Sequence, residues 1–369
     1  MRATRTIAFL AALVALATAP TVALGAQPTL KPLAQRIVAA GAPGAVVYVR
    51  DSTGVRAAAA GRADLKKKQA LTPAMSFRVG SITKSFVATV ALQLVGEGKL
   101  ALTDTLERWL PGVVPNGSQI TVPELLNHTS GVANYTDEVT FSRALVATPA
   151  RVWTPQDILS LIDGRPLLFA PGSVWYYSNT NFILLGLIVE RITGHPLGNE
   201  LRDRIFAPLR LGHSAFPTTN AVMPAPFAHG YLLPNNGFVP VRTFRDITAW
   251  NPSWAWAAGA VVSTADDLAR FYGALLAGDL LRPELLAVME DTVPMGADRD
   301  GPGYGLGMMH LAVTCSDVWG HTGEVPGYTS FVFAKRDGSR VVVILVNTSV
   351  GNRAGAAITN ELDTAFCRN

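Results

Sequence analysis

Ser81-Ile82-Thr83-Lys84 lies between a short extended approach, residues 77–80, and an apolar segment, residues 85–96. The apolar segment predicts a buried α-helix. Three residues make nearly one helical turn, so the Ser81 hydroxyl and the Lys84 amine should lie side by side. Ser81 would begin the helix, where unpaired backbone N–H groups favour a nearby negative charge. For an isolated Ser-x-x-Lys, a plain N-cap serine with a solvated lysine is the alternative. The rest of the sequence decides between these two interpretations.

The composition is that of a folded globular protein. The chain has 369 residues, of which 49% are hydrophobic and 16% are charged. These values exclude a disordered or a fibrous chain, and the length suits two domains or one large composite domain. We therefore expect a sizeable buried core.

The N-terminal residues 1–26 have the pattern of a secretory signal peptide. A basic start is followed by an apolar run over residues 7–17, by Pro20, and by small residues that suit cleavage after Gly25 or Ala26. The apolar run is too short for a membrane span, which needs about 20 residues. We therefore expect a secreted, extracellular protein with no membrane span.

Charge and cysteine content limit the possible partners. Removal of the leader, whose only charged side chains are Arg2 and Arg5, reduces the formal net charge from +4 to +2. This charge is too small to predict nucleic-acid binding. Cys315 and Cys367 are the two cysteines of the chain, and in an exported protein we expect them to form a disulfide. No Cys/His cluster has metal-ligand spacing, so the sequence predicts no metal and no other cofactor.

Both ends of the mature chain have β-strand patterns. Near the N-terminus, a helix over residues 30–40 precedes strands over residues 44–50 and 55–60. The strands predicted near the C-terminus cover residues 256–262, 304–313, 325–333 and 341–347. A hairpin turn at residues 335–340 contains Asp-Gly, and residues 354–366 predict a final helix. The first and last helices can lie together on one sheet.

The middle of the chain has helical periodicity instead. The clearest segments are residues 122–126, 155–162 and 181–192, which Pro/Gly-rich connections separate. The sequence therefore predicts an α/β (α+β) fold, in which an antiparallel sheet flanked by the N- and C-terminal helices is interrupted by an all-α domain. The expected sheet domain comprises residues 28–100 and 254–369, and the expected insert comprises residues 101–253.

Two further motifs follow Ser81 and Lys84 along the chain. No other serine has a lysine three residues later, and the triplets Tyr177-Ser178-Asn179 and His321-Thr322-Gly323 are each unique in their pattern. Each motif alone is weak. Their combination in this order is strong, and it is typical of penicillin-binding serine hydrolases.

On these motifs the chain resembles the family of serine D-alanyl-D-alanine carboxypeptidases and class C β-lactamases, and most closely the soluble secreted carboxypeptidases. The resemblance extends over residues 30–367. It is densest at residues 125–131, 176–182, 253–255, 304–307 and 320–323. It implies the same split architecture that the periodicity predicts, a β-lactamase/DD-peptidase-like fold.

The resemblance implies four catalytic residues: Ser81, Lys84, Tyr177 and His321. Ser81 would be the nucleophile of an acyl transfer, and Lys84 would accept its proton if its pKa is depressed. Tyr177 would relay a proton to the leaving amine and activate water for deacylation. The alternative of an isolated Ser-x-x-Lys is thereby disfavoured. His128, His195, His213 and His229 are given no catalytic role.

The resemblance also implies a set of substrate-binding residues: Asn179, Thr322, Gly323, Glu324, Trp254 and Phe141. Asn179 would hold both Lys84 and the substrate amide. The strand with Thr322 and Gly323 would pair with an extended substrate, and the backbone N–H groups of Ser81 and Glu324 would form the oxyanion hole. The two aromatic residues would line the cleft.

One part of the expected pocket departs from the resemblance. The similar carboxypeptidases bind the terminal carboxylate of their substrate with an arginine on the preceding strand and a threonine after His-Thr-Gly. Here the matching stretch is Met308-Met309-His310, and Glu324 follows Gly323. The missing cation and the added carboxylate both disfavour an anionic substrate end. Strict carboxypeptidase activity and efficient β-lactam recognition are therefore not expected.

The sequence thus predicts a secreted serine hydrolase that acts on D-amino-acid peptides or peptidoglycan fragments, with amide, ester or internal D-peptide substrates favoured. An esterase or a β-lactamase of the same family is an alternative, as is a non-catalytic module that binds penicillin or peptidoglycan. The intact Tyr177 and His321 disfavour the non-catalytic module. β-Lactams are possible ligands in each case.

Overall fold

The computed structural model describes residues 29–234, 243–298, 301–349 and 352–367. The predicted signal peptide lies outside these described residues. The largest sheet has nine strands in the order β3-β2-β1-β13-β12-β11-β10-β9-β8. All neighbouring strands in this sheet are antiparallel. The mixed α/β fold with an antiparallel sheet is therefore confirmed.

Strands from the two ends of the chain meet in the middle of this sheet. The N-terminal β1 (Gly44–Asp51) pairs with β2 (Gly54–Asp64) on one side and with the C-terminal β13 (Val341–Val346) on the other. β13 reads Val-Val-Val-Ile-Leu-Val and is buried throughout, because helices cover both faces of the sheet. The other strands are β3 (Gln69–Ala70), β12 (Tyr328–Ala334), β11 (Ser316–Val325), β10 (Met309–Val313), β9 (Gly303–Tyr304) and β8 (Val293–Pro294).

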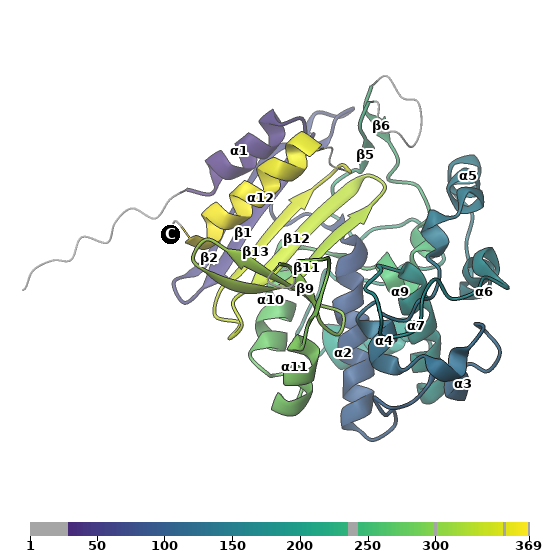
Figure 1. Ribbon diagram of the computed structural model, residues 1–369. Helices are drawn as coiled ribbons and strands as arrows, with labels where there is room; N and C mark the ends of the chain where they lie inside the picture. The colour runs from purple at the N-terminus through teal and green to yellow at the C-terminus, as the bar shows by residue number, and fades with distance from the viewer. Residues whose placement is uncertain (1–28, 235–242, 299–300, 350–351, 368–369) are drawn as a thin grey trace, which may run out of the picture.

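Helices pack on both faces of the sheet (Figure 1). α1 (Lys31–Ala39) and α12 (Asn352–Cys367) lie side by side on one face, as expected for the first and last helices. α10 (Ala265–Leu276) packs on β1, β12 and β13 from the other face. Because strand side chains alternate, Val47 enters the core under α1 and α12, while Val46 enters the larger core that contains α2 and α10.

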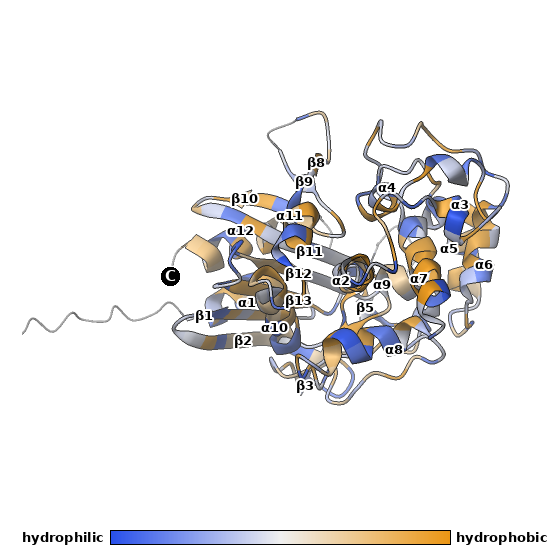
Figure 2. Ribbon diagram, turned by 90° about the horizontal axis from the view of Figure 1, so that it is seen from below, coloured by the Kyte–Doolittle hydropathy of each residue, from blue (hydrophilic) through white to orange (hydrophobic). Residues whose placement is uncertain are grey.

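α2 (Thr83–Gly96) lies between the sheet and the helices of the middle region (Figure 2). Because the sheet encloses α2 on one side and helices enclose it on the other, α2 is apolar on nearly all sides. On the helical side it contacts α7 (Asn179–Thr193). The other helices of this region are α3 (Leu106–Trp109), α4 (Val122–Leu126), α5 (Val139–Ala147), α6 (Pro155–Leu159) and α8 (Leu197–Leu201). None of the described helices is long and apolar enough to cross a membrane.

The middle region also contains a short two-stranded sheet, which the prediction of an all-α insert did not include. β5 (Tyr231–Leu232) pairs with β6 (Arg245–Asp246) in antiparallel fashion. The two strands are only two residues long, so they produce no alternating pattern in the sequence.

The segment 256–262 is mostly helical and not the predicted strand. Trp256–Gly259 form α9, and only Val262–Ser263 form a strand, β7, which pairs with β4 (Phe77–Arg78). The small residues of α9 allow it to pack closely on α7, where a Cβ on Gly186 would come within 2.7 Å of the Ala257 side chain. Packing between helices therefore decides the conformation here, and the apolar pattern alone does not distinguish the two structures.

Two other predicted strands are interrupted by turns. In the segment 304–313, β9 ends at Tyr304 and β10 begins at Met309, with Gly307 between them at a φ of +80°. In the segment 325–333, β11 ends at Val325, and Gly327, at a φ of +85°, belongs to the turn before β12. A positive φ favours glycine, which explains why the chain can reverse at these points.

α10 and α11 (Pro283–Glu290) are absent from the elements expected from the sequence. Their signals are present: the Thr264 side chain caps α10 by accepting a hydrogen bond from Asp267 N at 3.3 Å, and Pro283 occupies the first turn of α11. Both signals lie between two strand patterns, and α10 is the helix that packs on the second face of the sheet.

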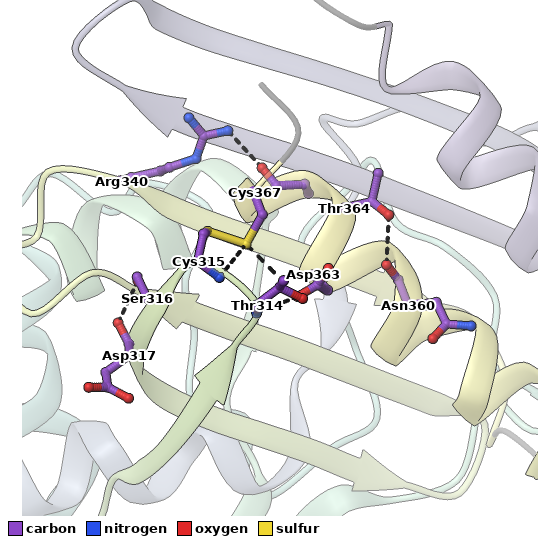
Figure 3. Close-up of a disulfide and its surroundings, with 10 residues drawn as sticks. Thr314, Cys315, Ser316, Asp317, Arg340, Asn360, Asp363, Thr364 and Cys367 are labelled. Atoms are coloured by element: carbon purple, nitrogen blue, oxygen red, sulfur yellow. Dashed lines mark hydrogen bonds between the residues drawn. A yellow bond between two sulfur atoms is a disulfide. The ribbon is translucent and has the colours of Figure 1, made fainter.

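A disulfide joins Cys315, before β11, to Cys367, in the last turn of α12 (Figure 3). The two Cα atoms are 5.5 Å apart, and the bond closes a loop with a sequence separation of 52. Beside it, Thr314 N donates to Asp363 Oδ1 at 2.6 Å, and Arg340 Nη2 donates to Ala365 O at 2.7 Å. The predicted pairing is therefore present, and it ties the last helix to the sheet.

We expect no free thiol in the unfolded but unreduced protein, because the two cysteines are bonded to each other. Thiol titration in denaturant measures this directly, and the same sample after reduction should yield two thiols per chain. The Cys315→Ser/Cys367→Ser variant should lose about 4 kcal/mol of unfolding free energy by the loop-closure estimate. Two reactive thiols before reduction would refute the bridge.

Candidate active site

Ser81 lies in the 3-10 turn η1 (Gly80–Ile82), which runs directly into α2. Gly80 has a φ of +56°, a conformation that glycine adopts without strain. A Cβ on Gly80 would lie 2.8 Å from the backbone N of Glu324, and a Cβ on Gly323 would lie 1.9 Å from Val79 O. Glycine at both positions therefore lets the turn with Ser81 approach β11 closely.

Lys84 follows one turn later and is fully buried. Its Nζ is 2.9 Å from Ser81 Oγ, 2.8 Å from Asn179 Oδ1 and 2.7 Å from Ala258 O. Burial lowers the pKa of Lys84 well below the ordinary 10.5, because removing the ammonium from water disfavours its charged form. The structure thus places the lysine beside the serine and does not leave it solvated.

Tyr177 and Asn179 reach this pair from the helical region. α7 begins at Asn179, whose backbone N donates to Asn134 Oδ1 at 3.0 Å. Tyr177 Oη donates to Ser81 Oγ at 2.7 Å, and the ring centroid of Tyr177 is 4.9 Å from Lys84 Nζ. Burial raises the pKa of Tyr177, so its phenol stays protonated at neutral pH.

These contacts determine where the protons lie when Lys84 is a neutral amine. A neutral amine has two N–H donors and one lone pair. Asn179 Oδ1 and Ala258 O can only accept, so they take the two N–H groups. The lone pair of Lys84 is then left for the Ser81 hydroxyl, while Tyr177 donates to the same oxygen. Ser81 is therefore arranged to give its proton to Lys84.

Ser81 and Tyr177 line a cleft of about 470 Å³, a size typical of small-molecule sites. One wall of the cleft is aromatic: the ring centroids of Phe141 and Trp254 are 5.4 Å apart, and those of Phe141 and Tyr135 are 5.3 Å apart. Tyr135 Oη donates to Trp254 O at 2.8 Å, which fixes this wall. The two aromatic residues singled out in the sequence therefore lie together in the cleft.

Met309 begins β10 and belongs to the stretch 308–310 that the resemblance matches to the carboxylate-binding strand. Met309 Sδ is 3.7 Å from Thr322 Oγ1, and both residues line the cleft. Met308 is buried, and His310 packs on Trp319 with 4.5 Å between ring centroids. Met309 is thus the residue of this stretch that faces the substrate space.

Glu324 lines the same cleft and is exposed to solvent. Of the described residues that line the cleft, Glu324 is the only one with a carboxylate, and none of them is an arginine or a lysine. Desolvation by the surrounding cleft raises the pKa of Glu324 above its ordinary value. The cleft therefore offers a carboxylate where an anion-binding pocket would need a cation.

His321 also lines the cleft, but its ring nitrogens form hydrogen bonds with groups other than the Ser81 and Tyr177 hydroxyls. Nε2 is 2.8 Å from Tyr304 Oη, and Nδ1 donates to the backbone O of Thr322. Among the contacts of the described residues, no hydrogen bond joins His321 to Ser81 or Tyr177. Unlike the other three predicted catalytic residues, His321 does not touch the reacting oxygen.

His128 and Tyr304 belong to the site, although no role was predicted for either residue. His128 is fully buried, its ring centroid is 4.3 Å from that of Tyr177, and its Nε2 is 3.2 Å from Tyr304 Oη. Both residues lie in stretches that carry the family resemblance, residues 125–131 and 304–307. Their positions in these two stretches are the signal from which a role in the site could have been predicted. No group of three or more His, Cys, Asp or Glu side chains suited to a metal ion occurs among the described residues.

Comparison with known proteins finds a family model and a relative that each cover most of the chain. A family model described as Beta-lactamase matches residues 30–365. Esterase EstB of Burkholderia gladioli is 30% identical over 350 residues, which cover 84% of this chain and 87% of that protein.

Two solved structures share the fold over nearly the whole chain. A D-stereospecific amidohydrolase from Streptomyces sp. has a TM-score of 0.83 and 36% identity, and the match covers 91% of this chain and 98% of that one. The D-amino acid amidase from Ochrobactrum anthropi SV3, complexed with L-phenylalanine, has a TM-score of 0.80 and 28% identity, with 90% and 96% of the chains covered.

Proposed function

The chain belongs to the beta-lactamase family, and from this premise we propose that it is a secreted serine hydrolase that cleaves D-amino-acid amides, esters and peptides through an acyl-enzyme on Ser81. The observation that carries this proposal is the contact of Ser81 Oγ with both Lys84 Nζ and Tyr177 Oη in an open cleft. The proposed substrates are D-amino-acid-containing peptides or peptidoglycan fragments. The disulfide supports export, because such bonds persist in oxidising compartments.

Acylation begins when Lys84 accepts the Ser81 proton and Ser81 Oγ attacks the substrate carbonyl carbon. The backbone N–H groups of Ser81 and Glu324 stabilise the negative charge that develops on the carbonyl oxygen. The close approach of η1 to β11 supports this assignment, because it brings Glu324 N next to Gly80. Tyr177 gives a proton to the leaving amine as the tetrahedral intermediate collapses.

Deacylation repeats these steps with water in place of the leaving group. Before water attacks, the Lys84 ammonium returns a proton to the Tyr177 phenolate. Tyr177 then orients the water and relays its proton to the neutral Lys84 amine as the water oxygen bonds to the acyl carbon. When the bond from that carbon to Ser81 Oγ breaks, the proton returns from Lys84 through Tyr177 to Ser81 Oγ. The hydrogen bond of 2.7 Å between Tyr177 and Ser81 supports a turnover enzyme over a module that acylates once and stalls.

The substrate side of the proposal rests on the cleft and on the relatives. The names of the two structural neighbours describe them as a D-stereospecific amidohydrolase and a D-amino acid amidase. An amide or ester has no terminal carboxylate, so it avoids repulsion by Glu324 and needs no cation at Met309. Penicillins carry a carboxylate and should be poor substrates for the same reason.

We predict that the C-terminal amide of a D-Ala-D-Ala peptide is cleaved faster than the free acid. The ratio of the two kcat/KM values should be about tenfold or more, since one unfavourable charge contact of about 1.4 kcal/mol suffices for this ratio. The ratio should shrink in Glu324→Thr, which removes the carboxylate. It should shrink further or reverse when Met309→Arg is added.

A control variant separates the local charge from the net charge of the protein. Glu284→Thr removes the same charge from the exposed surface of α11, and it should leave the ratio unchanged because distant surface charges are screened. A wild-type enzyme that prefers the free acid would show that the pocket obtains a cation from another residue.

An esterase is the second candidate, and the 30% identity to esterase EstB favours it. Ester and amide substrates use the same nucleophile, and they differ in the need to protonate the leaving group. Tyr177→Phe should therefore slow amide cleavage more than cleavage of an activated ester with the same D-acyl group. Equal losses would indicate that the natural leaving group needs no proton from Tyr177.

A further inference from the structure

A buried chain of hydrogen bonds runs beside the catalytic residues from the helical region to the sheet. It begins at the backbone N of Ser178, which donates to His128 Nδ1 at 3.2 Å. His128 Nε2 is 3.2 Å from Tyr304 Oη, and Tyr304 Oη is 2.8 Å from His321 Nε2. The chain ends where His321 Nδ1 meets the backbone O of Thr322. All three ring side chains are buried.

The direction of each hydrogen bond follows from the two backbone ends. Ser178 N–H and Asn181 Nδ2 both donate to His128 Nδ1, at 3.2 and 3.3 Å, so this nitrogen carries no proton. A neutral His128 therefore carries its proton on Nε2 and donates it to Tyr304 Oη. At the other end Thr322 O can only accept, so His321 carries its proton on Nδ1 and accepts from the Tyr304 hydroxyl at Nε2.

Both histidines are neutral in this arrangement. Burial, followed by the nearby Lys84, lowers the pKa of His128 well below its ordinary value and lowers that of His321 to about 3. Each ring therefore keeps one tautomer through neutral pH. Because this series of hydrogen bonds ends at a backbone group on each side, it does not deliver a proton to Ser81.

The two ends of this series of hydrogen bonds lie next to the groups that bind the reacting oxygen atoms. Ser178 directly follows Tyr177, whose hydroxyl contacts Ser81 Oγ at 2.7 Å. Thr322 lies on β11 two residues before Glu324, whose backbone N is the second proposed oxyanion donor. The chain therefore spans from the proton donor on the helical side to the oxyanion donor on the sheet side.

We propose that His128 and Tyr304 are positioning residues, which together with His321 hold Tyr177 and the substrate strand of β11 at a fixed separation through tautomer-locked hydrogen bonds. The kinetic part of this inference rests on the proposed hydrolase function. The tautomer part concerns the resting protein and needs no substrate. His321 thereby acts through its position and is not itself a proton donor in the reaction.

Tyr304→Phe tests the kinetic part. Loss of one hydroxyl leaves His128 Nε2–H and the His321 Nε2 lone pair without a partner, so kcat/KM for a D-amino-acid amide should fall about tenfold or more, mainly through kcat. KM should change about twofold at most. His128→Gln, which keeps a donor on a side chain of similar length, should retain more activity than His128→Leu.

Tyr328→Phe is the matched control. Tyr328 is equally buried, and its hydroxyl donates to Ala228 O at 2.9 Å, but it does not belong to the chain of histidines. Tyr328→Phe should lose stability to a similar extent while kcat stays within about twofold of wild type. If Tyr304→Phe loses no more kcat/KM than this control, the positioning role is overturned.

Long-range ¹H–¹⁵N spectra of histidine-labelled protein test the tautomers independently of any activity. Two of the six histidines should show opposite neutral tautomers that do not titrate between about pH 5 and 8, and the His128 variants assign them. In Tyr304→Phe the signal of His321 should change to exchanging tautomers, and in Tyr328→Phe it should not. If both residues titrate normally in the wild type, the inference is wrong. If only the amidase assay fails, it is the proposed function that fails.

Discussion

Ser81→Ala should reduce turnover of every D-amino-acid substrate to near background, and it should abolish labelling by a serine-directed phosphonate. The hydroxyl of Ser81 is the only group of the site that contacts both Lys84 Nζ and Tyr177 Oη among the described residues, and it would form the covalent intermediate. Loss of a nucleophile removes the reaction path itself, so the expected decrease in kcat is about 10⁴-fold or more. Steady-state kinetics and intact-protein mass measure the two effects.

Ser214→Ala serves as the control for this experiment. Ser214 is a half-buried serine whose hydroxyl contacts Asp267 Oδ2 at 2.9 Å, outside the cleft. This variant should be labelled and should turn over substrate like the wild type. A Ser81→Ala protein that still gains the mass of the phosphonate on another serine would show that the nucleophile has been misassigned.

Lys84→Met and Tyr177→Phe should each lower kcat/KM by about a thousandfold, and the double variant should be little worse than the poorer single variant. Both side chains act on the same oxygen: Lys84 Nζ is 2.9 Å and Tyr177 Oη is 2.7 Å from Ser81 Oγ. Once either is missing, the proton cannot complete its cycle between nucleophile and leaving group, so the second loss removes little more.

Asn179→Ala distinguishes proton transfer from positioning within this group. Asn179 Oδ1 accepts a hydrogen bond from Lys84 Nζ at 2.8 Å. This bond helps direct the lone pair of the amine towards Ser81. The variant should retain the base but orient it less well, and its loss should be smaller than that of Lys84→Met. If the losses of Lys84→Met and Tyr177→Phe simply multiply in the double variant, the two residues work independently and the shared mechanism is wrong.

The sequence predicted the parts of the site that depend on local spacing. The contact between Ser81 and Lys84 follows from their spacing of about one helical turn. The strand β13 follows from a continuous apolar run, because its side chains are buried on both faces of the sheet. The meeting of Ser81 with Tyr177 came from the family resemblance, since no local pattern relates residues on different elements. The disulfide followed from the presence of two cysteines in a chain expected to be exported.

The parts that the sequence did not predict depend on contacts between distant segments. α9 replaces a predicted strand because it packs against α7 at Gly186, and the turn at Gly307 is set by packing against α2. His128 and Tyr304 are buried in the structure, yet a histidine and a tyrosine in the sequence carry no sign of burial or of a partner. Their relation emerges only when the helical region and the sheet are assembled.

Labelling with a phosphonate analogue of D-phenylalanine, compared with its L enantiomer, tests the account most directly. The analogue forms a stable adduct with an activated serine, and its aromatic group suits the wall formed by Phe141 and Trp254. We predict that the intact protein gains the mass of one phosphonyl group, that peptide mapping places it on Ser81, and that the D form reacts faster. An adduct on a different residue, or faster reaction of the L form, would contradict a D-specific acyl-enzyme on Ser81.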